Sequence, residues 1–248
     1  MPVASLSTVA LYYELNGPTD APPLLLIHGA METFRHGWRK QIPVLSQDYR
    51  LIGPDLRGHG QSNNPANRLD LRQMADDLAE LLTHVGYAAA HVCGFSGGSS
   101  TALFLAYRHP ARLRSLTLVS NNFELDQIRT GAGQFWNPDR IRREEPQWWA
   151  RTEKLHPMSR MVDLLRWWAE EDKVRPNFSP AEIATIDLPT LVVGGDRDPI
   201  VPLEQSVSLF EHLPNSRLCI LPGVGHGLTS RRPELFNQIL LDFLAGLE

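Results

Sequence analysis

A serine at a strand-to-helix turn constrains this chain more than any other feature. The run Gly94 to Gly98 reads Gly-Phe-Ser-Gly-Gly, directly after an apolar segment and before a helix-like stretch, Ser99 to His109. Small flanking residues let a strand and a helix approach closely, and the turn leaves the hydroxyl of Ser96 exposed above a sheet, beside a helix N-terminus that favours negative charge. The bare pattern also fits an ordinary glycine-rich turn that caps a helix.

A second signal lies upstream, where Pro22 to Gly29 reads Pro-Pro-Leu-Leu-Leu-Ile-His-Gly. An unbroken apolar run of this kind is typical of a strand buried on both faces, as in a parallel sheet. Ala30 and Met31 would then lie at the tip of the strand, where a backbone N–H can pair with the N–H of Gly97 to hold an oxyanion. We expect His28 to be a hydrogen-bonded structural residue.

Two strand patterns downstream end in loops that carry an acid and a histidine. Leu191 to Gly195 precedes Asp196 and Asp198, and Leu218 to Leu221 precedes His226, which stands between two glycines. A serine hydroxyl is a poor nucleophile near neutral pH, so an imidazole must take its proton and a carboxylate must orient the imidazole. The three groups follow one another along the chain in the order serine, acid, histidine, which is the order that one known fold of hydrolytic enzymes uses.

Taken together, these segments resemble the α/β-hydrolase superfamily over nearly the whole chain. The segment Asp55 to Ser62 looks like the structural loop that follows the fourth strand of that family. The resemblance implies an α/β fold with a mostly parallel eight-stranded sheet flanked by helices. It selects Asp198, which precedes a Val-Pro pair, as the acid, whereas Asp196 would support the loop. Some members take the acid from the end of strand six, where this chain offers Glu124 and Asp126.

The resemblance also divides the chain into a core domain, residues 1–122 and 188–248, and a helical cap inserted after strand six, residues 123–187. Five of the six tryptophans fall in the expected cap. They would either form the small core of the cap or line an apolar substrate pocket that excludes water. The residues that we expect at the pocket are Met31, Phe95, Phe123, Trp136, Trp149 and Trp167.

Hydrophobic periodicity supplies the remaining elements. Weak alternation predicts a strand over Val9 to Leu15, and spacings of three and four predict helices over Leu71 to Val85 and Pro233 to Leu247. Among nine histidines, only His226 combines a strand end with flanking glycines. The default expectation for six others is the surface or a turn: His36, His84, His91, His109, His156 and His212.

Composition excludes several classes of function. A formal net charge of −4 and the lack of a basic run point away from nucleic acid and anionic membranes as partners. Cys93 and Cys219 fall in expected strands and are expected to be core thiols. Neither metal-ligand spacing nor a phosphate-binding loop is present, so we expect no metal and no cofactor. The N-terminus lacks a signal-peptide pattern, which makes a cytoplasmic monomer or homodimer with a small-molecule substrate the default expectation.

The expected function is a serine hydrolase that cleaves an ester, lactone or thioester through an acyl-enzyme on Ser96, with His226 as base, Asp198 as its orienting acid, and the N–H groups of Ala30 and Gly97 as the oxyanion hole. The short cap is similar to that of small esterases and lactonases, including the valacyclovir-hydrolase-like group. Amino-ester hydrolases can carry an acid at the position of Gly97, so this chain favours a neutral or apolar substrate. Carbon–carbon bond hydrolysis, hydroxynitrile lysis, perhydrolysis without a cofactor and a receptor-like protein with little turnover remain alternatives.

Overall fold

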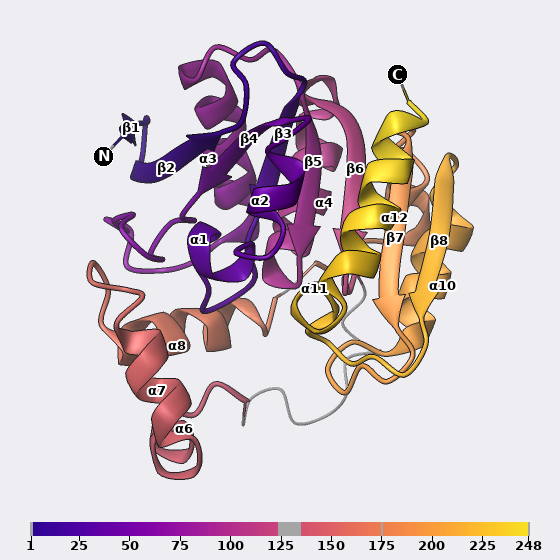
Figure 1. Cartoon of the computed structure of the whole chain (residues 1–248). Coiled ribbons are helices and arrows are strands. Elements are labelled where there is room, and N and C mark those ends of the chain that lie inside the picture. The colour runs from indigo at the N-terminus through magenta and orange to yellow at the C-terminus, as the bar shows by residue number, and fades with distance from the viewer. Residues whose placement is uncertain (1, 124–134, 175, 248) are drawn as a thin grey trace.

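An eight-stranded sheet forms the centre of the molecule, in the spatial order β1-β2-β4-β3-β5-β6-β7-β8. The computed structural model describes residues 2–123, 135–174 and 176–247 (Figure 1). The strands are β1 (Val3–Ser5), β2 (Ala10–Asn16), β3 (Pro23–Ile27), β4 (Arg50–Pro54), β5 (Ala90–Phe95), β6 (Leu113–Val119), β7 (Thr190–Gly195) and β8 (Ser216–Leu221). The pairs β1–β2 and β2–β4 are antiparallel, and the other neighbours run parallel. The predicted mostly parallel sheet is therefore confirmed.

The apolar run after Pro22 forms β3, and its alternate side chains enter two separate cores. Leu25 and Ile27 pack on one face of the sheet, and Leu24 and Leu26 pack on the other. All residues of β3 are buried. Because both faces exclude water, this strand is apolar throughout instead of alternating with polar residues.

Helices cover both faces of the sheet (Figure 1). The first core takes side chains from α3 (Leu71–His84), α4 (Gly97–Arg108) and α10 (Leu203–His212), and the second from α1 (Phe34–Gly37), α2 (Ile42–Leu45), α11 (Leu228–Arg231) and α12 (Pro233–Ala245). A short 3-10 turn, η1 (Pro110–Arg112), links α4 to β6.

The ends of α3 follow from the residues that flank it. The Asp70 side chain accepts hydrogen bonds from the N–H groups of Arg72 and Gln73, which would otherwise lack partners in the first turn. Gly86 follows the helix with φ +85°, a conformation that favours glycine. The observed helix, Leu71–His84, differs from the expected one only at its last residue.

Differences from the sequence-based expectation include the start of α4 and the edge of the sheet. The helix after Ser96 begins at Gly97 rather than Ser99, because the turn that carries the serine leads directly into it. The edge strand β1 has no counterpart among the expected elements. Its partner residues run from Val3 opposite Tyr12 to Ser5 opposite Ala10.

A helical insertion joins β6 to β7. Its described helices are α6 (Pro138–Glu144), α7 (Pro146–Glu153), α8 (Met161–Glu171) and α9 (Pro180–Ile183). Figure 1 shows α6, α7 and α8 beyond the end of the sheet toward which β5 and β6 point. In parallel sheets this carboxyl end is where ligands bind, so the insertion lies on the side where a site is expected.

Cys93 in β5 is buried and Cys219 in β8 is half-buried, and both are free thiols, as the sequence predicts. Burial raises the pKa of both thiols. Among the helices that the structure describes, none has both the length and the apolar character needed to cross a lipid bilayer.

Candidate active site

Ser96 occupies a strained turn between β5 and α4. Its backbone has φ +52° and ψ −120°, a conformation that side-chain-bearing residues rarely adopt. Its N–H donates to the Val119 carbonyl on β6 at 2.9 Å. A Cβ placed on Gly94 would lie 2.4 Å from the carbonyl oxygen of Gly98. Strand and helix therefore meet so closely here that position 94 admits only glycine.

Three side chains from separate loops form one hydrogen-bonded chain. His226 lies with its Nε2 2.8 Å from the Ser96 Oγ, and its Nδ1 lies 2.9 Å from the Asp198 Oδ2. A carboxylate can only accept, so Nδ1–H donates to Asp198, and the free lone pair of Nε2 accepts from the Ser96 hydroxyl. This is the arrangement in which an imidazole can take a proton from a serine.

The surroundings of Asp198 keep it ionised. Burial acts to raise the pKa of this carboxyl, but the hydrogen bond from His226 and two backbone N–H groups outweigh it and hold the pKa below its usual range. The two N–H groups belong to Ile200 and Val201, which donate to the Asp198 Oδ1 at 2.8 and 3.0 Å. Oδ2 is thereby left to face the histidine.

The second acid of this loop, Asp196, takes a different part. Its Oδ1 accepts a hydrogen bond from the N–H of Gly223 at 2.6 Å, which ties the loop after β7 to the loop after β8. Asp196 thus has the loop-supporting contact expected of it. The alternative acids Glu124 and Asp126 lie outside the described residues.

The two expected oxyanion donors, the N–H groups of Ala30 and Gly97, lie on segments that approach each other beside the Ser96 turn. A Cβ built on Gly97 would lie 3.4 Å from the Ala30 nitrogen, so the expected pair of donors lies close together. Neither N–H has an acceptor within residues 2–123, 135–174 and 176–247. The same Cβ would lie only 2.7 Å from the Trp168 indole, which therefore occupies the space where a side chain at Gly97 would stand.

His28 is a buried structural residue, as the sequence predicts. Its Nδ1–H donates to the Gly29 carbonyl at 2.8 Å, and its Nε2 accepts from the Leu56 N–H at 2.9 Å. Burial lowers the pKa of His28 to about 3, because the charged form would have to leave water. The ring is therefore neutral at physiological pH and holds the turn before Ala30.

The six residues expected at the pocket have diverse surroundings. Phe95 lies beside one of the reactive groups, with its ring centroid 5.3 Å from that of His226. Met31 is buried with φ +59°. Trp167 lies next to Gly58, in the loop after β4. Phe123 is fully buried, and its N–H donates to the Gln205 side chain.

The tryptophans of the insertion divide into separate clusters. Trp149 lies under the guanidinium of Arg142, 4.4 Å from ring centroid to carbon, within the insertion itself. Trp136 stacks on Trp168 with ring centroids 5.9 Å apart. Trp168, which was not among the expected pocket residues, contacts the turn after Ser96. The adjacent pair Trp167-Trp168 was the available signal, because only one of two neighbours can face a given side of a helix.

The default expectation of a surface or turn location is wrong for His91, whereas His156 lies in a turn segment as expected but is buried. His91 in β5 is buried, and its Nδ1 lies 2.8 Å from the Ser115 Oγ. His156, between α7 and α8, is only 2% exposed. Burial lowers the pKa of each to about 4. Both positions escaped the sequence analysis because a lone histidine outside a periodic pattern carries no local sign of burial.

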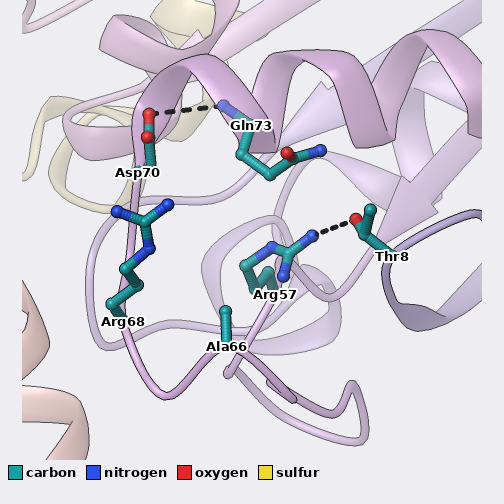
Figure 2. A pocket seen from close by; sticks show the side chains of 6 residues that line it. All are labelled: Thr8, Arg57, Ala66, Arg68, Asp70 and Gln73. Atoms are coloured by element: carbon teal, nitrogen blue, oxygen red, sulfur yellow. Dashed lines mark hydrogen bonds between the residues drawn. The ribbon is translucent and has the colours of Figure 1, made fainter.

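Within the described ranges, no group of three or more histidine, cysteine, aspartate or glutamate side chains is arranged to hold a metal ion. A hollow of about 170 Å³ lies beside the start of α3 (Figure 2). Its lining residues are Thr8, Arg57, Ala66, Arg68, Asp70 and Gln73. None of the expected site residues is among them.

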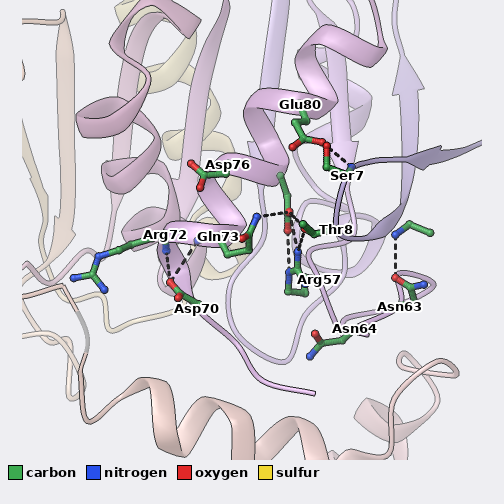
Figure 3. Close-up of polar contacts among 12 residues, drawn as sticks. Ser7, Thr8, Arg57, Asn63, Asn64, Asp70, Arg72, Gln73, Asp76 and Glu80 are labelled. Atoms are coloured by element: carbon green, nitrogen blue, oxygen red, sulfur yellow. Dashed lines mark hydrogen bonds and ion pairs between the residues drawn. The ribbon is translucent and has the colours of Figure 1, made fainter. Parts of the chain in front are cut away.

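A buried ion pair closes one wall of this hollow. The Arg57 guanidinium donates to both carboxylate oxygens of Asp77 at 2.9 Å and to the Thr8 hydroxyl at 2.7 Å. Both charged side chains are at most 3% exposed. Figure 3 shows Arg57 beneath α3, beside Thr8, while Ser7 reaches Glu80 further along the helix. The pair thus fastens the loop after β4 and the N-terminal segment to α3.

Comparison with known protein families agrees with the observed fold. The family model described as alpha/beta hydrolase fold matches residues 22–153, more than half of the chain, and the model described as TAP-like protein matches residues 166–247. The chain therefore belongs to the α/β-hydrolase family.

Individual relatives cover nearly the full length. A protein named "Putative carbamate hydrolase RutD", from Caulobacter sp. (strain K31), is 28% identical over 260 residues, covering 95% of this chain and 96% of its own. The 3-oxoadipate enol-lactonase 1 of Acinetobacter baylyi is 25% identical over 260 residues, covering 96% and 94%. The solved structure of a thermophilic esterase from Thermogutta terrifontis has a TM-score of 0.80 and 27% identity, covering 98% and 96%. Family and relatives together support a hydrolase.

Proposed function

We propose that this protein is a serine hydrolase that cleaves a carboxylic ester, lactone or thioester through an acyl-enzyme on Ser96. One observation carries the proposal: the unbroken hydrogen-bonded chain from Asp198 through His226 to the Ser96 hydroxyl. The N–H groups of Ala30 and Gly97, which have no acceptor among the described residues, lie on segments close to this strained turn and support the proposed oxyanion hole. The proposal gives Ser96 the part of nucleophile, His226 that of base and Asp198 that of orienting acid, and the closeness of these residues supports it.

In the first step the Ser96 Oγ bonds to the substrate carbonyl carbon, and its proton passes to the His226 Nε2. The carbonyl oxygen becomes an oxyanion that accepts hydrogen bonds from the N–H groups of Ala30 and Gly97; one such donor typically contributes about 100- to 1000-fold in rate. His226 gives the proton to the leaving oxygen or sulfur as its bond to carbon breaks. A water then repeats the sequence on the acyl-enzyme and releases the acid.

The surroundings favour a small neutral or apolar substrate. Position 97 is a glycine, so it offers no carboxylate that could bind an ammonium group. The space beside it is occupied by the indole of Trp168. Phe95 and Met31 add apolar surface near the reactive groups. The relatives named as an enol-lactonase and an esterase support cleavage of an ester-type bond, and the relative named as a carbamate hydrolase makes carbamates the next class to test.

We further propose that residues 123–187 act as a cap over this site. The described helices of the insertion lie at the carboxyl end of the sheet, and Trp168 from α8 contacts the Ser96 turn. A cap that excludes water strengthens the electrostatic interactions with the developing oxyanion.

The test is hydrolysis of p-nitrophenyl esters from acetate to octanoate, followed by γ-lactones and p-nitrophenyl carbamates. We expect turnover by the wild type, and a loss in Ser96→Ala of about 10⁴-fold or more in kcat, because the covalent route is removed. Ser208→Ala on α10 is the control and should match the wild type. An unchanged rate in Ser96→Ala, or no turnover of any of these substrates by folded wild type, would contradict the proposal.

A further inference from the structure

His156 links the insertion to two loops of the core. It lies between α7 and α8, yet both of its ring nitrogens bond to backbone groups far away in the chain. Its Nδ1 accepts from the Gly60 N–H at 2.8 Å, and its Nε2 lies 3.2 Å from the Met31 carbonyl oxygen. A carbonyl can only accept, so the ring proton must be on Nε2. Both contacts are buried.

The Met31 contact falls on the turn that carries a proposed oxyanion donor. Met31 has φ +59°, a conformation that persists in a non-glycine residue only where its surroundings hold it. The carbonyl of Gly29, on the other side of Ala30, accepts from the Nδ1–H of His28. The turn that presents the Ala30 N–H is therefore held at both ends, once by the core and once by the insertion.

The Gly60 contact ties the same histidine to the loop after β4. In that loop, Asp55 accepts from the N–H groups of Gln61 and Phe34, at 3.0 Å each. Phe34 opens α1, the helix that follows the Met31 turn. His156 thus spans two segments that the core itself joins through Asp55, and any shift of the ring acts on both.

A second contact of the insertion reaches the other proposed donor. The indole N–H of Trp168 donates to the Nε2 of His59 at 2.9 Å, and this indole lies against Gly97. The rings of His59 and His156 are neighbours, with their centroids 5.6 Å apart. The insertion therefore contacts the peptide segments of both Ala30 and Gly97 through one buried cluster.

We propose that His156 is a positioning residue for the oxyanion hole: its Nε2–H holds the Met31 turn so that the Ala30 N–H points at the developing oxyanion. This inference rests on the proposed serine-hydrolase function. In this proposal the insertion does more than cover the site, because it also holds the peptide segment of one oxyanion donor in place.

A matched pair of amides separates the two bonds of His156. The side-chain nitrogen of glutamine can stand in for Nε2 and donate to Met31, whereas the side-chain oxygen of asparagine can stand in for Nδ1 and accept only from Gly60. We expect His156→Asn to lower kcat for p-nitrophenyl esters about 10-fold with KM within about 2-fold, because a displaced donor weakens transition-state binding more than substrate binding. His156→Gln should recover most of kcat. Met158→Ala, at an exposed position of the same link, is the control.

A second readout does not depend on turnover. The Glu32 N–H donates to the Gly29 carbonyl across the Met31 turn, so its amide hydrogen exchange reports on that turn. We expect about 10-fold faster exchange at Glu32 in His156→Asn and nearly wild-type exchange in His156→Gln. If wild type hydrolyses none of the esters, the proposed function fails and the role in the oxyanion hole fails with it, and the exchange rates then decide only whether His156 holds the Met31 turn. Equal losses of kcat in both variants, a rise in KM alone, or unchanged exchange in His156→Asn would overturn it.

Discussion

At the scale of single residues, the loop after β7 presents two carboxylates with different partners. Asp198 faces the Nδ1 of His226, and Asp196 accepts from a backbone N–H of the neighbouring loop. The two residues share a loop and a charge, so their substitutions form a natural comparison. Both carboxylates accept hydrogen bonds from backbone N–H groups, but the contact with an imidazole is one that Asp198 has and Asp196 lacks among the contacts described above.

Asp198→Asn should lower kcat for ester hydrolysis about 10⁴-fold, the scale seen when the acid of a serine triad is neutralised, because the imidazole then loses its tautomer and its charge stabilisation. Asp196→Asn should stay within about 3-fold of wild type. Steady-state kinetics on one p-nitrophenyl ester checks both. If Asp196→Asn loses as much kcat as Asp198→Asn, the assignment of Asp198 as the acid is wrong.

At the scale of elements, the buried ion pair between the loop after β4 and α3 stabilises how these segments pack. Arg57 and Asp77 are nearly inaccessible to water, so removal of one partner leaves the other charged or unsatisfied in the interior. Surface pairs behave differently, because water already solvates both charges. Lys173 and Glu170, each 66% exposed, form such a pair on the insertion.

Arg57→Met should lower the free energy of unfolding by about 3–5 kcal/mol, the usual cost of breaking a buried pair. Lys173→Ala should change it by less than about 1 kcal/mol. Urea denaturation at pH 7.5 measures both. If the two variants lose equal stability, the buried pair does not fasten the loop to α3 as described.

The same elements show what the sequence could predict. β3 was identifiable because a strand buried on both faces is apolar at every position, and the Ser96 turn because close approach leaves room only for small residues. His156 was not, because its partners are the backbone atoms of Gly60 and Met31, 96 and 125 residues away. Neither of those contacts leaves a trace in side-chain type or spacing.

Similarly, the pair Trp167-Trp168 indicated that one indole faces the site, and the expected one was Trp167. Both indoles are buried, and the one that lies against Gly97 is Trp168. That choice depends on the rotation of α8 about its own axis, which follows from packing against His59 and the turn at Gly97. The residues that come together at Ser96 were thus more predictable than the way the insertion meets them. Sequence motifs indicate the residues of the site, whereas tertiary contacts determine how the insertion packs against it.

At the scale of the whole molecule, a cluster of neutral histidines joins insertion and core. Burial lowers the pKa of His28 to about 3, that of His156 to about 4, and that of His59 well below its usual value. Each ring uses its unprotonated nitrogen to accept an N–H, so a second proton would remove that hydrogen bond. The folded state therefore excludes protons that the unfolded chain binds.

The consequence is loss of stability in acid. An unfolded histidine takes up its proton near pH 6.5, so the free energy of unfolding should fall as the pH drops from about 6.5 to about 4, by up to about 1.4 kcal/mol per pH unit for each such residue. Asp55 and Asp77 act in the opposite direction, because burial raises the pKa of both carboxyls, that of Asp55 to about 6, and their protonation favours the folded state over part of this range. The histidines whose pKa burial lowers are His28, His59, His91 and His156, so they outnumber these two carboxyls.

Urea unfolding of wild type and His156→Gln at pH 7.5, 5.5 and 4.5 isolates the contribution of one ring, since Asp55 is common to both proteins. The difference in stability between wild type and variant should shrink as the pH falls. A difference that stays constant across the three pH values would mean that His156 has the same pKa in the folded and the unfolded protein, which contradicts its burial.

The central claim, that Ser96 is the nucleophile of an acyl-transfer site, is tested most directly by a p-nitrophenyl alkylphosphonate and intact-protein mass spectrometry. Attack by the Ser96 Oγ on phosphorus would displace p-nitrophenolate and leave one phosphonyl group, which peptide mapping would locate. The account predicts a single adduct on Ser96, absent in Ser96→Ala and slowed in Asp198→Asn. No adduct on the folded protein, or an adduct on another residue that persists in Ser96→Ala, would contradict it.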